Sequence, residues 1–304
     1  YPFFQIPGCT DELACNYNPD ANISDDTCDY SCHDNGNYSL SFNGINQYVE
    51  IPHSEQFNFL DFTISFSGIF PEDINDWFQS PVSKDCCGCE QVNRDWTFVE
   101  KDGFLYFVAD DSGDFDLAHA VSYPYELLND GLEHNIVLTR DGSTGELNLF
   151  IDAELVDTAT DFTGYIDNSA PITFALYSIC GGDYANYFQL SEVSMWNTVL
   201  NQENIESIQE SILDDQGLVG YWKFSSGEGS TLYDHSGNGN HGTIYGATWV
   251  IEGCTDEEAC NYDQEAIIDD DSCDYTCHDN GDYSLRFDGI DDYALLDNDI
   301  LNGL

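Results

Sequence analysis

The chain has 304 residues, with 58 Asp and Glu against 6 Lys and Arg, which gives a formal net charge of −52. A surface this acidic repels phosphate backbones and anionic lipid, which argues against nucleic-acid binding and against binding to membrane surfaces. Very acidic chains are often disordered, but 41% hydrophobic and 14% aromatic content is too high for disorder. No apolar run is long enough for a transmembrane helix. The sequence therefore predicts folded domains with acidic surfaces.

A long motif occurs twice in the chain. Residues 8–44 and 253–289 are identical at 26 of 37 positions, at a constant offset of 245. A match of this length predicts an array of repeats. The expected units are the last strand of a preceding repeat (1–7), a Cys-rich module (8–32), a large domain (33–252), a second Cys-rich module (253–277) and the start of the next large domain (278–304). We expect the sequence to begin inside a longer chain, because it starts at Tyr1 with neither an initiator Met nor a signal peptide.

Twelve cysteines fall into three groups of four, which is typical of disulfides formed in an oxidising compartment. An extracellular or cell-surface protein is therefore expected. The groups are Cys9, Cys15, Cys28 and Cys32; Cys86, Cys87, Cys89 and Cys180; and Cys254, Cys260, Cys273 and Cys277. The alternative is zinc, which favours Cys-x-x-Cys pairs that the two terminal groups lack.

Residues 8–32 are too few to bury a core, so two disulfides are expected to replace one. Pairing Cys9 with Cys28 would close a 20-residue loop, worth on the order of 3 kcal/mol. Cys15 with Cys32 would then be the second bridge. Four cysteines allow three pairings, and the spacing leaves the choice open.

Short side chains with oxygen ligands crowd these stapled loops. Hard oxygen ligands suit Ca²⁺, so we expect structural calcium in both modules; the alternative is a solvated acidic loop. The candidate ligands are Asp11, Asn16, Asp25, Asp26 and Asp29, and in the second copy Asp256, Asn261, Asp270, Asp271 and Asp274.

The module resembles the "GCTD…NY…A…DD.SC.Y" repeats of very large secreted surface proteins, adhesins or filament proteins, of marine and gliding bacteria. The residues that carry this resemblance are Gly8-Cys9-Thr10-Asp11, Asn16-Tyr17, Ala21, Asp25-Asp26 and Cys28-Asp29-Tyr30. The resemblance implies an extracellular repeat protein. The pair formed by Cys15 and Cys32 is an addition to the pattern.

The large domain alternates apolar and polar residues with period 2, which predicts strands with one buried face. The expected strands are 38–42, 62–66, 96–100, 104–109, 134–140, 146–152, 172–178, 187–196, 218–224 and 242–250. One helix is expected, capped by Asn201, with Ile205, Ile208, Ile212 and Leu213 on one apolar stripe. Many short strands and a single helix indicate an all-β sandwich or jelly roll.

Three segments, 38–52, 132–156 and 217–250, resemble laminin-G-like domains, which have a concanavalin-A-like jelly-roll fold. The resemblance implies a structural Ca²⁺ between the first hairpin and the "DHSGNGNHG" loop. The loop ligands would be Asp234, Asn238 and Asn240, and the next domain would add Asp288 and Asp291, where this domain has Asn43 and Asn46. Asn brings an oxygen but no charge, which weakens the site in the first domain.

Catalysis is not expected. Glycoside hydrolases of this fold class need two carboxylates flanking the scissile bond, on a Glu-x-Asp-x-x-Glu string or a close variant. The nearest string, Ile151-Asp152-Ala153-Glu154, ends a strand at a turn. His134 and His241 are interpreted as core or edge histidines, and His33 and His278 as turn caps.

Two functional hypotheses follow. The first is a non-catalytic structural or adhesive repeat of a long extracellular fibre or giant adhesin, whose partners are further repeats of the same chain or identical chains. The alternative is a carbohydrate-binding, lectin-like domain of a secreted protein that contacts cell-surface glycans. Regular alternation with stapled modules favours the first. The glycan contacts of the second would be Trp77, Tyr184 and Tyr187.

Overall fold

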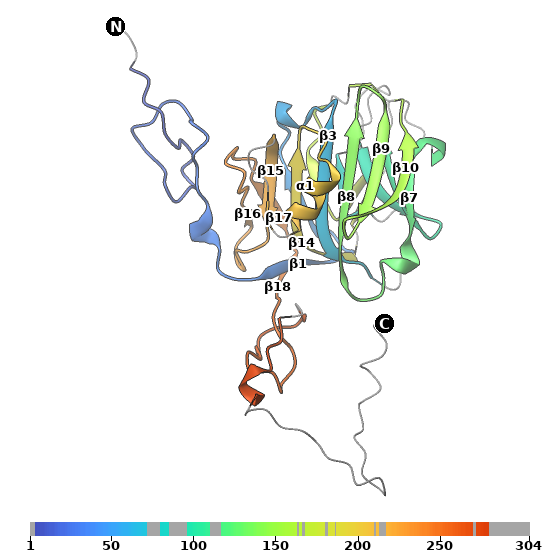
Figure 1. Cartoon of the computed structure of the whole chain (residues 1–304). Coiled ribbons are helices and arrows are strands. Elements are labelled where there is room, and N and C mark those ends of the chain that lie inside the picture. Colours follow the sequence, from blue (N-terminus) through green and yellow to red (C-terminus); the bar gives the residue numbers. More distant parts are fainter. Residues whose placement is uncertain are drawn as a thin grey trace, which may run out of the picture.

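The structure is a computed structural model of the whole chain. It describes residues 4–71, 80–84, 96–109, 117–162, 164–165, 168–179, 182–185, 187–209, 211–212, 217–269 and 272–279. The large domain is a sandwich of two antiparallel eight-stranded sheets, and the two Cys-rich modules lie outside it near one edge (Figure 1). The expected all-β jelly-roll class is confirmed.

The first sheet has the order β10-β9-β8-β3-β14-β1-β18, and β15 also pairs with β14. Its strands are β10 (Glu154–Thr160), β9 (Glu146–Ile151), β8 (Glu133–Asp141), β3 (Phe62–Ile69), β14 (Tyr187–Trp196), β1 (Tyr38–Asn43), β18 (Thr248–Ile251) and β15 (Leu218–Lys223). Because β1 and β18 are antiparallel neighbours, with Tyr38 opposite Ile251, the chain begins and ends the sandwich at one place.

The second sheet has the order β16-β17-β2-β11-β4-β5-β6-β7. Its strands are β16 (Thr231–Leu232), β17 (Gly242–Tyr245), β2 (Tyr48–Ile51), β11 (Ile172–Phe174), β4 (Val82–Lys84), β5 (Trp96–Lys101), β6 (Phe104–Ala109) and β7 (Val121–Pro124). A separate hairpin pairs β12 (Leu176–Ile179) with β13 (Gly182–Ala185). Short 3-10 turns lie at the ends of the two modules (Ser31–His33 and Thr276–His278) and before β3, β7 and β8 (Glu55–Phe57, Leu117–His119 and Tyr125–Leu127).

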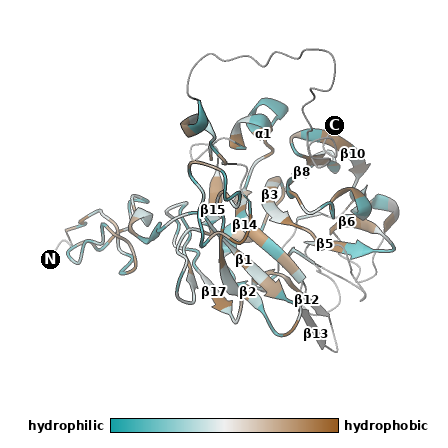
Figure 2. Ribbon diagram, turned by 90° about the horizontal axis from the view of Figure 1, so that it is seen from below, coloured by the Kyte–Doolittle hydropathy of each residue, from teal (hydrophilic) through white to brown (hydrophobic). Residues whose placement is uncertain are grey.

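The core lies between the sheets and is built by the period-2 alternation. On β3, Phe62, Ile64 and Phe66 are buried in the main apolar cluster, whereas Thr63 and Ser65 belong to the opposite face. Hydrophobic and hydrophilic positions interchange along the strands in the same way (Figure 2). Aromatic edge contacts such as Phe66 against Phe98, with centroids 4.9 Å apart, join the two sheets.

Two expected strands are each broken in two. The 172–178 strand is interrupted at Ala175, which has a φ of 57°, and continues as β12. The 242–250 strand is divided by a turn at Gly246, with a φ of 72°, so that β17 joins the second sheet and β18 the first. Positive φ ends a strand locally, and the alternating pattern does not reveal it.

The single α-helix, α1 (Gln202–Ile208), lies on the outer face of the first sheet. The Asn201 side chain accepts a hydrogen bond from the Asn204 N–H at 2.9 Å, as its capping role predicts. Ile205 and Ile208 pack against Val137 and Trp196 in a second apolar cluster. The helix ends earlier than expected, since Ile212 lies beyond its last residue, and Leu213 lies outside the described residues.

Candidate functional site: the junction between module and jelly roll

Each Cys-rich module is held by two disulfides. The structure pairs Cys9 with Cys28 and Cys15 with Cys32, one of the three pairings that the spacing allowed. The second module repeats it, with Cys254 joined to Cys273 and Cys260 to Cys277. The middle group, Cys86, Cys87, Cys89 and Cys180, lies outside the described residues.

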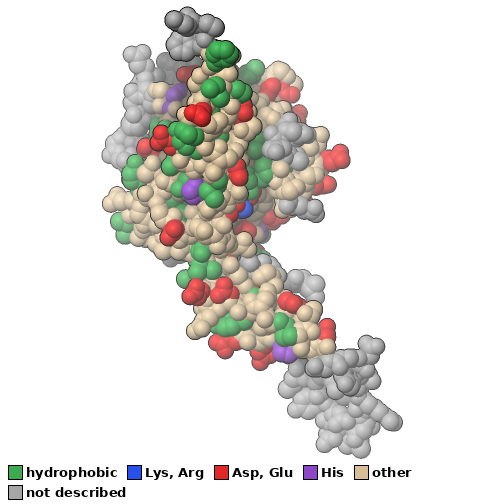
Figure 3. Space-filling model, turned by 90° about the vertical axis from the view of Figure 1, so that its left-hand side faces the viewer, with side chains coloured by type: hydrophobic (Ala, Val, Ile, Leu, Met, Phe, Trp, Pro, Cys, Tyr) green, Lys and Arg blue, Asp and Glu red, His purple; other side chains and the backbone are tan. Residues whose placement is uncertain are grey.

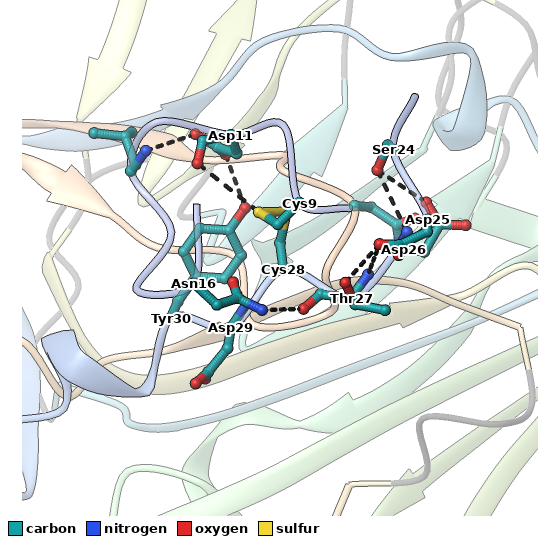
Figure 4. The surroundings of a disulfide bond; sticks show 12 residues. Cys9, Asp11, Asn16, Ser24, Asp25, Asp26, Thr27, Cys28, Asp29 and Tyr30 are labelled. Atoms are coloured by element: carbon teal, nitrogen blue, oxygen red, sulfur yellow. Dashed lines mark hydrogen bonds between the residues drawn. A yellow bond between two sulfur atoms is a disulfide. The ribbon is translucent and has the colours of Figure 1, made fainter. Parts of the chain in front are cut away.

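The polar side chains of the first module hold its own turns (Figure 4). Asn16 donates to the Thr27 carbonyl at 2.6 Å and accepts from the Asp29 N–H at 2.9 Å, which ties two loop strands together. Asp25 accepts from the backbone and hydroxyl of Thr27, and Asp29 accepts from Ser31. Hydrogen bonds from the Ser31 backbone and hydroxyl lower the pKa of Asp29. These carboxylates therefore act as turn caps.

Asp11 faces the jelly roll. One of its oxygens, Oδ2, accepts from the Tyr30 hydroxyl at 2.8 Å and from His241 Nε2 at 2.8 Å. The Asp234 N–H donates to His241 Nδ1, so the proton of the neutral ring is on Nε2 and points at Asp11. Burial opposes ionisation of Asp11, but hydrogen bonds from the Leu13 N–H, Tyr30 and His241 outweigh it and lower its pKa. This contact joins the module to a loop more than two hundred residues away.

The loop that receives the module is organised by Asp234, whose side chain is fully buried. Its carboxylate accepts backbone N–H groups from Tyr221, Ser236 and Asn240 at 2.8–2.9 Å. The Asn240 carbonyl in turn accepts from the indole of Trp222. The expected calcium ligand is thus the centre of a hydrogen-bonded turn that presents His241.

Asn238 and Asn240 serve the same loop. The Asn238 amide donates to the carbonyls of Leu218 and Val219, and the Asn240 amide donates to Val219 at 2.8 Å. Both also hydrogen-bond to Gln56. Their side chains therefore attach the loop to the strands beneath it.

Two glycines let this loop approach the module closely. Gly237 and Gly239 have φ values of 85° and 73°, which favour glycine. A Cβ atom on Gly237 would lie 3.2 Å from the Asp26 carbonyl oxygen, and one on Gly239 would lie 3.4 Å from Asp11 Oδ2. The backbone of the loop is therefore in direct contact with the module.

Aromatic rings complete the junction. Tyr30 is 2% exposed, and its ring meets His241 edge-on with centroids 4.7 Å apart. His33 stacks on Tyr233 with centroids 3.7 Å apart, while its Nε2 contacts the Leu13 carbonyl at 2.9 Å. Together with Cys9 and Ala14, Tyr30 and Tyr233 form a small apolar cluster between module and jelly roll.

Asp34, just after the module, anchors the connecting segment. It contacts Lys223 Nζ at 2.9 Å and His235 Nε2 at 3.0 Å, and it accepts from the Ser225 hydroxyl. Burial opposes its ionisation, but the hydrogen bonds from Ser225 and Lys223 outweigh burial and lower its pKa. The segment that connects the module to β1 is therefore also fixed to the jelly roll, in addition to the contacts of Asp11, Tyr30 and His33.

The described residues give this account of the expected metal ligands. Within the described part of the chain, no three carboxylates gather closely enough to share one ion; the groups that do gather are Cys15, Cys32 and His33, and Cys260, Cys277 and His278. Their cysteines are bonded to each other, so these are disulfides and not metal ligands. Asn261 and Asp274 repeat the bonds of Asn16 and Asp29. Asp270, Asp271, Asp288 and Asp291 lie outside the described residues.

A polar hollow of about 430 Å³ lies on the outer face of the first sheet, beside the end of α1. Its lining includes Asn135, Glu192 and Tyr221, and also Glu133 and Glu252. Burial raises the pKa of Glu192 despite the hydrogen bond from the Tyr221 hydroxyl, which lies 2.9 Å away. Asn135 Oδ1 is buried and unpaired. The hollow combines hydrogen-bonding groups with carboxylates.

The predicted glycan contacts are not brought to this hollow. Tyr187 is 49% exposed at the start of β14, and its ring packs over Gly44. Trp77 and the side chain of Tyr184 lie outside what the structure describes.

No helix among the described residues is long and apolar enough to span a membrane.

The histidines differ from one another in role. His134 is a satisfied edge residue, because its two ring nitrogens contact Asp152 at 2.8 Å and Asp130 at 3.2 Å. Asp152 and Ala153 form the hairpin turn between β9 and β10, with φ values of 50° and 63°. His241, interpreted as a core or edge histidine, lies in the loop before β17 and contacts the module. In the sequence, the recurrence of Asp11 and Tyr30 in both modules is the signal that relates to this contact.

Comparison with known proteins agrees with this fold. Residues 43–206 match the concanavalin A-like lectin/glucanases superfamily, and the chain belongs to this family. No protein of curated function matches the sequence. The expected laminin-G-like fold is therefore confirmed for the large domain.

Many solved structures are similar to this chain, and three examples follow. A "putative carbohydrate binding protein from Bacteroides ovatus" superimposes with a TM-score of 0.54 at 17% identity, covering 77% of this chain and 62% of that one. The chain thus spans less than two thirds of that protein. The binding domain of botulinum neurotoxin DC has a TM-score of 0.42 at 16% identity (57% and 41% covered). A pentraxin from Limulus polyphemus has 0.41 at 12% (59% and 83%).

Proposed function

We propose that this chain is a non-catalytic structural repeat of an extended extracellular protein, in which stapled modules and jelly rolls alternate. The observation that carries the proposal is the fixed junction at Asp11, Tyr30 and His241. A spacer that merely linked two domains would not need to bury a tyrosine against its neighbour. The junction instead orients the module on the jelly roll that follows it.

A second junction, between each module and the strand before it, occurs twice with the same geometry. The Asn22 N–H donates to the Ile6 carbonyl at 2.9 Å, and 245 residues later the Ile267 N–H donates to Ile251 at 3.0 Å. The parallel bridges Pro7–Ile23 and Glu252–Ile268 also correspond. Residues 4–7 thus follow the path that the end of β18 takes into the second module. The same connection therefore suits successive units of an array.

The surface fits an extracellular setting. Two of the six Lys and Arg, Lys84 and Arg140, are buried, as are the acids Glu100, Asp161 and Asp234, so the surface keeps nearly the whole net negative charge. Acidic side chains are spread over the face shown in Figure 3, with little Lys or Arg among them. Mutual repulsion of such units favours an extended arrangement in salt water.

Electron microscopy of the native full-length protein tests this proposal. Threads with a regular axial repeat, one bead for each 245-residue unit, are expected. Compact isolated particles in calcium and salt would contradict it.

The polar hollow favours a second candidate, carbohydrate binding, because hydroxyl-rich ligands are recognised by convergent amide, hydroxyl and carboxylate groups. A glycan array with the chain would detect such binding. The variant Asn135→Ala should abolish a signal that arises in the hollow, whereas Tyr187→Ala should leave it intact. Binding unaffected by Asn135→Ala would place the sugar elsewhere.

A further inference from the structure

We propose that the exposed face of the second Cys-rich module, formed by Asp256, Tyr275 and His278, is a docking surface for a jelly roll that carries a loop like Tyr233–His241. This inference rests on the proposed function, because the occupant is the jelly roll of the next unit. It adds a specific contact and the chemistry that recognises it.

The two modules are alike inside and differ on this face. Tyr275 donates its hydroxyl to Asp256 at 2.6 Å, as Tyr30 does to Asp11 at 2.8 Å. His278 Nε2 contacts the Glu258 carbonyl at 2.7 Å, as His33 contacts Leu13. The buried alanine and the half-cystine at the centre are likewise equivalent, with Ala259 9% and Cys254 1% exposed. The described residues of the second module therefore have the same internal contacts as those of the first.

The two modules differ in how far the equivalent side chains of this face are exposed to solvent. Tyr30 is 2% exposed and Tyr275 is 47% exposed. Asp11 and His33 are partly buried, whereas Asp256 and His278 are exposed. In the first module, the loop after β16 makes this difference, since Tyr233 stacks on His33 and His241 meets both Asp11 and Tyr30. The same side chains on the second module are arranged for the same partner.

The contacts define what the partner must supply. It needs an imidazole N–H aimed at the acceptor oxygen of Asp256 and aromatic side chains that cover the exposed ring of Tyr275. It also needs glycines where Gly237 and Gly239 bring backbone against the module. In this chain the loop Tyr233–His241 already contacts the first module. The second module therefore needs the loop of another jelly roll, and the sequence after it repeats the beginning of one: residues 278–289 correspond to 33–44.

A tandem protein tests the inference with the whole chain present. Residues 1–304 are followed by a second copy of residues 60–252, which continues the repeat because residue 304 corresponds to 59. Hydrogen exchange of the Cys260 amide, bonded to the Asp274 carbonyl, is compared between the chain and the tandem. The amide of Cys15, which is bonded to Asp29, is the internal reference.

The expected result is that exchange at Cys260 slows at least fivefold in the tandem and approaches the rate at Cys15. Nitration of Tyr275 should slow in parallel. In a tandem whose appended copy carries His241→Ala, both effects should be lost. The melting curve of this variant is the control that its second jelly roll is folded.

Unchanged exchange at Cys260 in a folded tandem would overturn the inference. Threads of regular beads in micrographs would then still support the proposed function, so the two failures are distinguishable. Concentration-dependent dimerisation of the 304-residue chain, with protection of Tyr275, would also overturn it, because the occupant would then be a second copy of this chain.

Discussion

At the scale of single residues, Asp11 is the acidic side chain that connects the first module to the jelly roll. It accepts from Tyr30 within the module and from His241 of the jelly roll, whereas its counterpart Asp256 accepts from Tyr275 and Glu258 within its own module. The pair of aspartates is therefore a matched experiment within one chain.

The variant Asp11→Asn should loosen the first module. It removes the negative charge that accepts hydrogen bonds from His241 and Tyr30. The loss of one such hydrogen bond costs on the order of 1 kcal/mol. Amide exchange at Cys15 should accelerate several-fold. Asp256→Asn is the control, and its effect at Cys260 should be smaller. Equal effects of the two variants would show that the His241 contact contributes nothing.

The junction should also depend on pH. The pKa values of Asp11 and Asp34 are lowered in the folded protein, so their ionised forms stabilise it above their ordinary pKa of about 3.9, and this stabilisation is lost as the pH falls through the lowered values. The Leu13 amide, which donates to Asp11, should therefore change its chemical shift as the pH falls below about 4. A Leu13 amide with no transition in this acidic range would contradict the assignment.

At the scale of elements, the loop between β16 and β17 determines how closely the module approaches. Gly237→Ala adds a Cβ atom 3.2 Å from the Asp26 carbonyl, in addition to the strain of about 1 kcal/mol that alanine has at positive φ. Gly229→Ala is the control, because Gly229 has a φ of 79° and nothing within 4 Å of its Cβ position. Thermal unfolding should show a larger loss for Gly237→Ala. Equal losses would mean that the module does not rest on this loop.

Many of the strands were predictable from the sequence. Period-2 alternation of apolar residues located β3, β5, β6, β8, β9 and β14, because each of these strands places alternate apolar side chains in the main core cluster. The breaks at Ala175 and Gly246 were not predictable, since they depend on local φ values that period-2 patterning does not encode. Short strands such as β4 and β7 have too few residues to show a period.

The site shows the same limit. The loop Asp234–His241 was recognised as a motif in the sequence. Its contact with Asp11 was not predicted, because Asp11 and His241 are more than two hundred residues apart in the chain. The resemblance to laminin-G-like domains implied oxygen ligands in this loop, whereas in the structure backbone N–H groups surround the Asp234 carboxylate. Only the three-dimensional arrangement reveals that these acids hold turns and a junction.

At the scale of the whole molecule, calcium stabilisation stays a prediction. Millimolar Ca²⁺ should add on the order of 1 kcal/mol per site at affinities usual for extracellular modules. Melting temperatures with calcium and with chelator measure this, and Asp11→Asn should retain the difference because Asp11 is engaged by Tyr30 and His241. Identical melting curves in both conditions would exclude structural calcium.

The central claim is that the first module and the jelly roll form one rigid body through the junction at Asp11, Tyr30 and His241. Residual dipolar couplings of backbone amides in the 304-residue chain test it most directly, because they report the orientation of each part. A single alignment tensor should fit the amides of residues 8–34 together with those of the sandwich strands. Separate tensors, with reduced amplitude for the module, would mean that it moves independently and would contradict the account.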